Sequence, residues 1–212
     1  MSGPDPQGRQ AFLEAIDVPR ETLARLDTYA ALLVKWQARI NLVAPRSLAA
    51  LWTRHFLDSA QLLPLVAANR PGGLPARWLD LGSGAGFPGL VLANLGAGEV
   101  HLVESDGRKC SFLRQVIRST GASAEIHQTR IESLAPFPVD LITARALAPL
   151  ESLLGYTHRF WREGCEAWFL KGEEWQEELT SCTQSWTVEA ETFLSRTHPS
   201  GRILRVRSMA RA

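Results

Sequence analysis

Apolar residues in the first third of the chain recur at helical spacing. One stripe runs through Leu23, Leu26, Ala30, Leu33, Trp36 and Ile40, and a second through Leu48, Leu51, Trp52, Leu62 and Leu63. Each stripe predicts an amphipathic helix, whereas the first ten residues are rich in Gly, Pro and polar groups and are expected to fray. The loop-like stretch 69–75 divides a helical N-terminal extension, residues 1–70, from residues 71–212, and we expect the two to form one compact unit.

From Arg77 onward, short apolar stretches alternate with helical patterns. The stretches are Trp78–Leu81, Val100–Glu104, Ala124–His127, Val139–Thr143 and Ala167–Leu170, and the clearest helix is Arg108–Thr120. This alternation predicts an α/β fold with a doubly wound, mostly parallel sheet. No helix is predicted between Thr187–Leu194 and Ile203–Arg207, so this pair is expected to form an antiparallel hairpin at the edge of the sheet.

Composition and charge exclude several classes of protein. The chain has 212 residues, of which 45% are hydrophobic and 21% charged, with a net charge of +1. These values are typical of a globular protein and exclude a disordered or collagen-like chain. No apolar run is long enough to span a membrane, and residues 1–10 lack the apolar core of a secretory signal. The sequence therefore predicts a cytoplasmic protein.

Cysteine and histidine spacing gives no indication of a metal centre. The three cysteines, Cys110, Cys165 and Cys182, form no C-x-x-C pair, so neither a disulfide framework nor structural zinc is expected. The five histidines form no H-x-x-x-H pair and have no carboxylates at ligand spacing, so no metal site is predicted.

A glycine-rich loop is the most informative segment. Asp80–Gly89 reads DLGSGAGFPG and lies between a predicted strand and a predicted helix. Glycines allow sharp turns and close approach of a ligand, and such loops bind ligands at the carboxyl ends of parallel strands. Glu104 ends the next strand, at the position from which a carboxylate accepts hydrogen bonds from ribose hydroxyls.

Two classes of cofactor compete for this loop. Residues 84–89 match G-x-G-x-x-G, the pattern of dinucleotide sites. However, Asp80 precedes the first glycine by two residues, the pattern starts two residues late, and the helix opens with Phe87 and Pro88. S-adenosylmethionine has no phosphate, so a proline there costs little. These features favour S-adenosyl-L-methionine over a nicotinamide or flavin cofactor, and the predicted contacts are Asp80, Gly82, Gly84, Gly86 and Glu104.

Six short strings in one order resemble a known family. They are RHFLDS (54–59), DLGSGAGFPG (80–89), ES with RK and FLR (104–114), RIE (130–132), TARA (143–146) and LKG (170–172). Together they are similar to the bacterial small-subunit rRNA guanine-N7 methyltransferase family (RsmG, also called GidB). The similarity covers about residues 41–207. The chain departs mildly from the family pattern, with Glu104 where some members carry Asp and Ala144 where Ser is frequent.

The resemblance implies a class I S-adenosylmethionine-dependent methyltransferase with a Rossmann-like sheet. It implies methylation of N7 of guanine 527 of 16S rRNA, in the standard rRNA numbering, within the small ribosomal subunit or a precursor. The family's cofactor contacts fall on Gly82, Phe87, Ile131, Glu132 and Arg145. The competing interpretations are a core position for Phe87, a helix start for Glu132 and a surface ion pair for Arg145.

Other polar residues are candidates for the acceptor side. His55 and Asp58 are three residues apart on a predicted helix, so Asp58 is expected to orient His55. Lys171 follows the fifth strand, and Arg108, Lys109, Arg114 and Arg118 form a basic helix face; these five are the candidate rRNA contacts. For each, the competing interpretation is an ordinary solvated or core residue.

The expected chemistry needs positioning more than acid–base catalysis. A guanine N7 carries a lone pair and no proton, so we assign no catalytic base and place Arg145, Lys171 and His55 near the acceptor. The sequence has no Pro-Pro-aromatic string for an exocyclic amine and no strand-end Pro-Cys for a covalent adduct. The alternatives left open are another methyltransferase, a non-catalytic S-adenosylmethionine- or RNA-binding module and a dinucleotide-dependent oxidoreductase.

Overall fold

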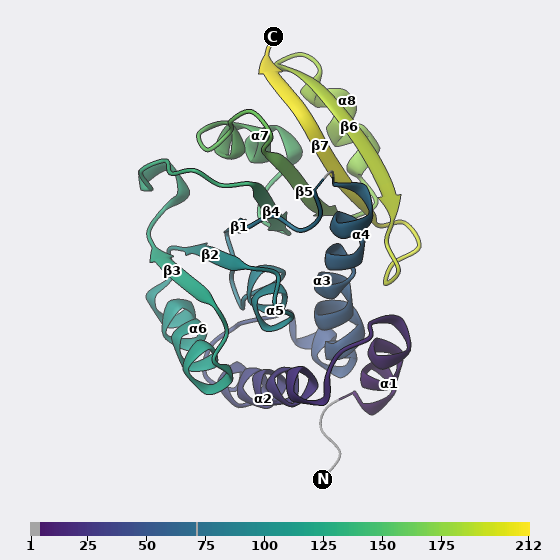
Figure 1. Ribbon diagram of the computed structural model, residues 1–212, viewed down its shortest axis with the longest axis vertical. Helices are drawn as coiled ribbons and strands as arrows, with labels where there is room; N and C mark the ends of the chain where they lie inside the picture. Colours follow the sequence, from purple (N-terminus) through teal and green to yellow (C-terminus); the bar gives the residue numbers. More distant parts are fainter. Residues whose placement is uncertain (1–4, 71) are drawn as a thin grey trace.

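The structure is a computed structural model that describes residues 5–70 and 72–212. Its centre is one seven-stranded sheet with the order β3-β2-β1-β4-β5-β7-β6 (Figure 1). The strands are β1 Arg77–Leu81, β2 Glu99–Glu104, β3 Ala124–Gln128, β4 Leu141–Arg145, β5 Glu166–Lys171, β6 Trp186–Leu194 and β7 Arg202–Arg211. Strands β1 to β5 are parallel, and β7 runs antiparallel to both β5 and β6. The predicted mostly parallel sheet and its antiparallel C-terminal hairpin are confirmed.

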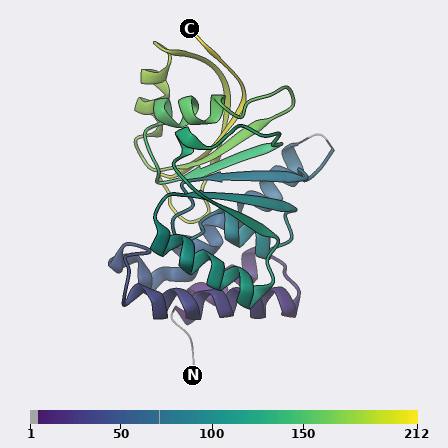
Figure 2. The same ribbon diagram turned by 90° about the vertical axis from the view of Figure 1, so that its left-hand side faces the viewer.

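Helices cover both faces of the sheet. They are α1 Pro6–Ala15, α2 Arg20–Gln37, α3 Asp58–Ala60, α4 Leu62–Asn69, α5 Gly89–Asn94, α6 Gly107–Thr120, α7 Leu150–His158 and α8 Trp175–Cys182. Short 3-10 helices span Pro45–Ala50 and Ile131–Ser133, and a π-helical turn spans Trp52–Leu57. Figure 2 shows the N-terminal helices, α5 and α6 on one side of the sheet and α7 and α8 on the other. None of the helices in the described residues has the length and apolar character needed to cross a lipid bilayer.

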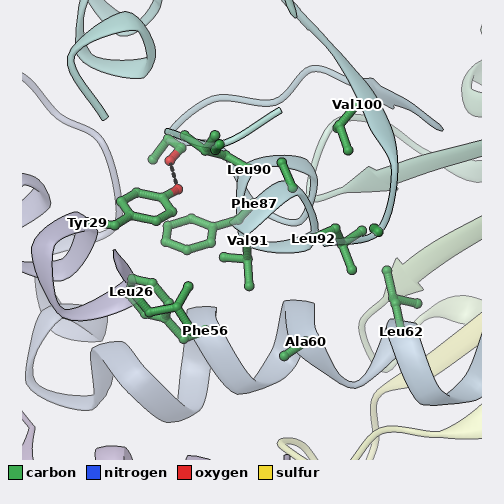
Figure 3. Packing of buried hydrophobic residues seen from close by; sticks show 14 of the residues in the cluster. Leu26, Tyr29, Phe56, Ala60, Leu62, Phe87, Leu90, Val91, Leu92 and Val100 are labelled. Atoms are coloured by element: carbon green, nitrogen blue, oxygen red, sulfur yellow. Dashed lines mark hydrogen bonds between the residues drawn. The ribbon is translucent and has the colours of Figure 1, made fainter. Parts of the chain in front are cut away.

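The N-terminal helices share a core with the sheet. Leu26 of α2 and Phe56 are fully buried and pack in one cluster with Leu90 of α5 and Val100 of β2 (Figure 3). Phe112 of α6 belongs to the same cluster. The two units predicted from the sequence therefore share one continuous core. Burying each aromatic or leucine side chain stabilises the fold by roughly 1.5–3 kcal/mol. A second cluster fills the space between the sheet and α7 and α8.

Two details of the N-terminal region differ from the sequence-based expectation. Residues 6–15 are helical, so the prediction of fraying is wrong for residues 6–10, whereas residues 1–4 lie outside the described residues. The Asp5 carboxylate accepts hydrogen bonds from the backbone N–H groups of Gly8 and Trp52, both at 2.9 Å. This is an N-cap that also links α1 to the π-helical turn Trp52–Leu57. The second predicted helix is divided into 3-10, π and α segments, and the π turn carries Arg54 and His55. Such turns occur frequently at functional sites.

Candidate functional site

A cavity of about 990 Å³ lies over the carboxyl ends of β1, β2 and β4. Its wall contains five of the predicted cofactor residues from the loop and the strand ends, together with three segments far apart in sequence. These segments are 42–58, 129–132 and 195–203. The volume lies at the upper end of the range for small-molecule sites, so the cavity has room for a cofactor and part of a second reactant.

The glycine loop is shaped by its own backbone and by its neighbours. The N–H of Ser83 donates to the carbonyl of Val103 on β2 at 2.9 Å, and the N–H of Gly86 donates to the carbonyl of Ser83 at 2.7 Å. Gly84 has φ of 57°, and a Cβ there would meet only the Gly82 carbonyl, at 3.8 Å. Because Gly84 lines the cavity, a side chain at this position would enter the space left for a ligand.

Asp80 and Gly86 are not in the cavity wall. The Asp80 carboxylate is buried and accepts hydrogen bonds from the Thr143 hydroxyl at 2.9 Å and from the Gly89 N–H at 3.2 Å. A Cβ on Gly86 would lie 2.5 Å from the Tyr29 hydroxyl oxygen. Both residues therefore help to set the position of the loop, and their direct contact with the cofactor stays a prediction.

The same contacts argue against a pyrophosphate at the start of α5. The Gly89 N–H is used by the Asp80 carboxylate, and the Leu90 N–H donates to the Gly86 carbonyl at 2.9 Å. A dinucleotide site needs free N–H groups and a favourable field at this end of the helix. Burial raises the pKa of Asp80 to about 6, which is still below neutral pH, so the carboxylate that accepts from Gly89 is mostly ionised and would repel a pyrophosphate.

Glu104 occupies the centre of the cofactor side. It is 8% exposed, and its two carboxylate oxygens accept hydrogen bonds from the N–H groups of Gly84 at 2.9 Å and Asp106 at 2.7 Å. A carboxylate oxygen can accept more than one hydrogen bond, so both oxygens retain capacity for ribose hydroxyls. The residue thus links the loop to the start of α6 while lining the cavity.

Phe87 packs in the core and also lines the cavity, and its contact with the cofactor stays a prediction. Its ring stacks on Tyr29 with centroids 5.5 Å apart and packs edge-on against Phe56, and Figure 3 shows the three rings together. It also lines the cavity and lies under the guanidinium of Arg145, 5.1 Å from the ring centroid. The Tyr29 hydroxyl donates to the carbonyl of Ala85, so α2 supports the loop from below.

Arg145 connects the end of β4 to the N-terminal segment. Its guanidinium donates to the Asp58 carboxylate at 3.1 Å, to the Arg54 carbonyl at 2.9 Å and to His55 Nδ1 at 2.9 Å. The predicted pairing of His55 with Asp58 is replaced by this arrangement, in which both contact Arg145. Arg145 is therefore neither a simple surface ion pair nor a free cation.

The hydrogen bonds of His55 define its protonation state. Arg145 can only donate, so Nδ1 of His55 accepts and Nε2 carries the proton, which it donates to the Ser47 hydroxyl at 2.8 Å. Burial, followed by the charges of Arg145 and Arg54, lowers the pKa of His55 to about 3. The imidazole is therefore neutral at physiological pH and has both nitrogens engaged.

The remaining predicted residues lie at the rim of the cavity or outside it. Ile131 and Glu132 are in the wall, in the 3-10 turn after β3. Lys171 also lines the cavity, but its ammonium is paired with Glu178 at 2.6 Å and its side chain is 9% exposed. On α6, Lys109 lines the cavity, whereas Arg108, Arg114 and Arg118 are exposed.

The family model for rRNA small subunit methyltransferase G matches residues 22–203. The chain is 51% identical over 204 residues to the ribosomal RNA small subunit methyltransferase G of Paramagnetospirillum magneticum, covering 96% of this chain and 97% of that one. It is 50% identical to the protein of the same name from Rhodospirillum rubrum, with coverage of 96% and 98%.

The chain belongs to the rRNA small subunit methyltransferase G family.

Solved structures with low sequence identity to this chain share its fold. The crystal structure of cofactor-bound Rv0187 from MTB superposes with a TM-score of 0.61 at 18% identity, covering 98% of this chain and 99% of that one. A ribosomal protein L11 methylase from Lactobacillus delbrueckii gives a TM-score of 0.54 at 16% identity, covering 72% and 78%. The fold is that of class I S-adenosylmethionine-dependent methyltransferases, as predicted.

Several residues in or near the cavity were missed by sequence reasoning. The β6–β7 turn reaches the cavity because the Thr197 hydroxyl donates to the Asp58 carboxylate at 2.6 Å and the Arg196 N–H donates to the Gln61 side chain at 2.8 Å. Ala146, also in the wall, has φ of 51°, a conformation that costs a non-glycine residue roughly 1–3 kcal/mol and that clusters at functional sites. Arg46 and Arg54 line the cavity and are exposed.

Proposed function

We propose that this chain transfers a methyl group from S-adenosyl-L-methionine to N7 of a guanine in 16S rRNA, at guanine 527 in the standard rRNA numbering. The observation that carries the proposal is the cavity, which joins Glu104 and the glycine loop to an arginine-rich rim in a member of this family. The relatives named above are methyltransferases of small-subunit rRNA by name. The reaction belongs in the cytoplasm, where the small ribosomal subunit or its precursor is available.

The residues present fit this cofactor. Gly82 and Gly84 line the cavity with backbone atoms alone, because glycine has no Cβ. Glu104 offers acceptors for two hydroxyl groups. Ile131 offers an apolar contact for a base, and Glu132 offers a polar one. S-adenosylmethionine supplies an electrophilic methyl group on a positively charged sulfur. The protein's part is to hold Glu104 and the loop in place before binding, which the hydrogen bonds from Gly84 and Asp106 do.

The side chains on the acceptor side of the cavity favour a methyl acceptor that has no proton to lose. His55 has both nitrogens engaged, Asp58 is bonded to Arg145 and Thr197, and Glu178 is paired with Lys171. These groups are poorly suited to act as a general base. Guanine N7 presents a lone pair, so orientation alone can supply much of the acceleration, up to about 7–11 kcal/mol in well-oriented reactions.

The rRNA contacts that we propose follow from charge and position. Lys109 lines the cavity, and Arg108, Arg114 and Arg118 are exposed on the same helix, α6. Lys171 remains in this set, with the condition that RNA would have to compete with Glu178 for its ammonium. Arginine suits phosphate contact because its guanidinium is planar and bidentate.

The test is methyl transfer from labelled S-adenosylmethionine to small ribosomal subunits that lack the modification, followed by digestion to nucleosides. We expect 7-methylguanosine as the labelled product, mapped to guanine 527. Label in any other nucleoside would overturn the assignment of N7, and 7-methylguanosine at another position would overturn the assignment of the guanine. Deproteinised 16S rRNA in a parallel reaction shows whether the folded particle is needed.

A further inference from the structure

The parallel register of β2 and β3 brings two histidines and a glutamate together on one face of the sheet. His101 on β2 is the register partner of Glu125 on β3, and His127 follows two residues later. His101 Nδ1 lies 2.9 Å from His127 Nε2 and 3.7 Å from a Glu125 oxygen, and the other Glu125 oxygen lies 4.0 Å from His127 Nε2. This group was not predicted from the sequence, because His101 lies on a different strand from Glu125 and His127.

We propose that His101, Glu125 and His127 form a binding site for a divalent transition metal ion of the zinc type. Their ligand atoms all lie within 4.8 Å of one another. Zinc bound by imidazole nitrogen at about 2.0–2.1 Å in tetrahedral geometry requires donor atoms roughly 3.4 Å apart. The observed separations bracket that value, so small side-chain rotations complete the site without moving the strands.

A further carboxylate orients the central ligand. His101 Nε2 is buried, makes no hydrogen bond of normal geometry and lies 3.2 Å from Glu99 Oε1. Glu99 is itself held by Arg77 at 3.0 Å. A proton on Nε2 directed at Glu99 leaves the lone pair of Nδ1 facing Glu125 and His127. Histidine ligands of zinc characteristically have such a carboxylate on their other nitrogen.

The surroundings define which ion fits. His101 is 5% exposed, and the ring of Phe137 lies over both imidazoles, with centroids 4.7 and 5.3 Å away. Two imidazoles and one carboxylate suit zinc, cobalt or nickel, whereas magnesium and calcium prefer all-oxygen ligands. The Glu125 side chain is 62% exposed, so the fourth position faces solvent and water can occupy it.

The site lies away from the cofactor cavity, whose wall contains none of its three ligands. It nevertheless joins β2 to β3 just before both strands deliver residues to that wall: Glu104 ends β2, and Ile131 follows β3. The proposed ion is therefore structural, and it holds the two strands in the register that this side of the cavity requires. It takes no part in the proposed methyl transfer.

The experiment is a titration of untagged, metal-free protein with Co²⁺ followed by visible absorption, with Zn²⁺ then added as competitor. We expect saturation at one equivalent, the d–d bands of a four-coordinate ion, and their loss as Zn²⁺ displaces Co²⁺. Cysteine does not confuse the signal, since all three cysteines are buried and thiolate ligands add an intense charge-transfer band that His and Glu ligands lack.

Matched variants separate this site from adventitious binding. His127→Gln should weaken Co²⁺ binding by at least about 100-fold, and Glu99→Gln, which removes only the orienting carboxylate, by roughly 10- to 100-fold. His158→Gln removes an exposed histidine on α7 and should change nothing. Circular dichroism checks that each variant is folded. The proposal is overturned if the wild type binds Co²⁺ no more tightly than His127→Gln, or if His158→Gln weakens binding equally.

Discussion

The two sides of the cavity are held in place by contacts of different range. On the cofactor side, the Gly86 N–H bonds to Ser83 and the Gly84 N–H bonds to Glu104, 20 residues away on the adjacent strand. On the acceptor side, Arg145 reaches His55 across 90 residues, and Thr197 reaches Asp58 across 139. The first side is encoded in one motif and its neighbouring strand, whereas the second exists only once both ends of the chain have packed on the sheet.

This difference suggests that the two sides of the cavity have different functions. The cofactor side is built before any ligand arrives, since Glu104 and the loop are already bonded to each other. The acceptor side joins the π turn, the end of β4 and the β6–β7 turn through polar side chains. Damage to one side should therefore affect cofactor binding and damage to the other should affect stability and rRNA methylation, which the following variants test.

The largest effect is expected from Gly84→Val. A branched side chain would enter the cavity and would also strain a backbone with φ of 57°. We expect no measurable binding of S-adenosylmethionine by calorimetry. The matched control is Gly96→Val, because Gly96 has φ of 80° and open space around it but does not line the cavity. Normal affinity in Gly84→Val, or equal loss in both variants, would remove the loop from the cofactor site.

Glu104→Gln should weaken cofactor binding by about 10- to 100-fold. Hydrogen bonds to a charged group contribute roughly 1.5–3 kcal/mol, and the amide NH₂ would also face one of the two backbone N–H donors that the carboxylate now accepts. Calorimetry of the variant measures this loss, with Glu163→Gln on an exposed turn as control. An unchanged dissociation constant would mean that another residue holds the ribose.

On the acceptor side, Asp58→Asn should destabilise the fold while leaving cofactor affinity nearly unchanged. The Asp58–Arg145 pair is largely buried, with side chains 17% and 16% exposed, so losing its charge should lower the free energy of unfolding by about 1.5–3 kcal/mol. Asp27→Asn breaks a half-buried pair with Arg9, whose side chains are 42% and 35% exposed, and should cost less, about 1 kcal/mol. Urea denaturation compares them; equal costs would contradict the role given to Asp58.

The protonation of His55 gives a pH test of the same side. Its folded-state pKa of about 3 is below the ordinary value, so the unfolded chain takes up a proton first as pH falls below about 6.5. The His55 contribution to stability is therefore lost toward low pH, by at most about 1.4 kcal/mol per pH unit. The pKa of Asp80 is raised to about 6, so protonation of Asp80 increases the stability of the folded state as pH falls. The His55 contribution must therefore be measured as the difference in stability between the wild type and a His55 variant.

We expect the wild type to lose more stability than His55→Gln between about pH 6.5 and pH 5, measured by urea unfolding at each pH. His158→Gln, at an exposed position, should follow the wild type. Parallel pH profiles for wild type and His55→Gln would show that His55 is not the group responsible.

The smallest effect on the protein itself is expected from replacing Arg114 and Arg118 together with Ala. Both are exposed and bonded to neighbouring glutamine side chains, so stability should change by under about 1 kcal/mol and cofactor affinity not at all. If this face contacts rRNA, binding to small subunits weakens, and the slope of log K against log salt falls by somewhat under one per lost contact. Unchanged methylation at two salt concentrations would exclude this face.

The cofactor side was largely predictable because its determinants are local. The spacing of Asp80, the glycines and Glu104 located the loop, and alternating strands and helices gave the sheet. What the sequence could not show is which of these residues face the cavity, because this depends on how the loop folds. Gly84 lines the cavity, whereas Asp80 and Gly86 contact residues of the core.

The acceptor side and the histidine cluster were not predictable for a related reason. The contacts of Arg145 with His55 and Asp58, and of Asp58 with Thr197, depend on how distant segments meet. His101 and His127 are 26 residues apart and become neighbours only through the register of two parallel strands. The capped helix α1 is a different case, because Asp5 before Pro6 was a local signal that composition alone obscured.

The central claim, that the cavity above the glycine loop is an S-adenosylmethionine site, is tested most directly by calorimetric titration of the wild-type protein with S-adenosylmethionine and, separately, with NADH. The structure predicts saturable one-to-one binding of S-adenosylmethionine and none of NADH, because the N–H groups of Gly89 and Leu90 are already engaged. Tight binding of NADH with no binding of S-adenosylmethionine would contradict the account.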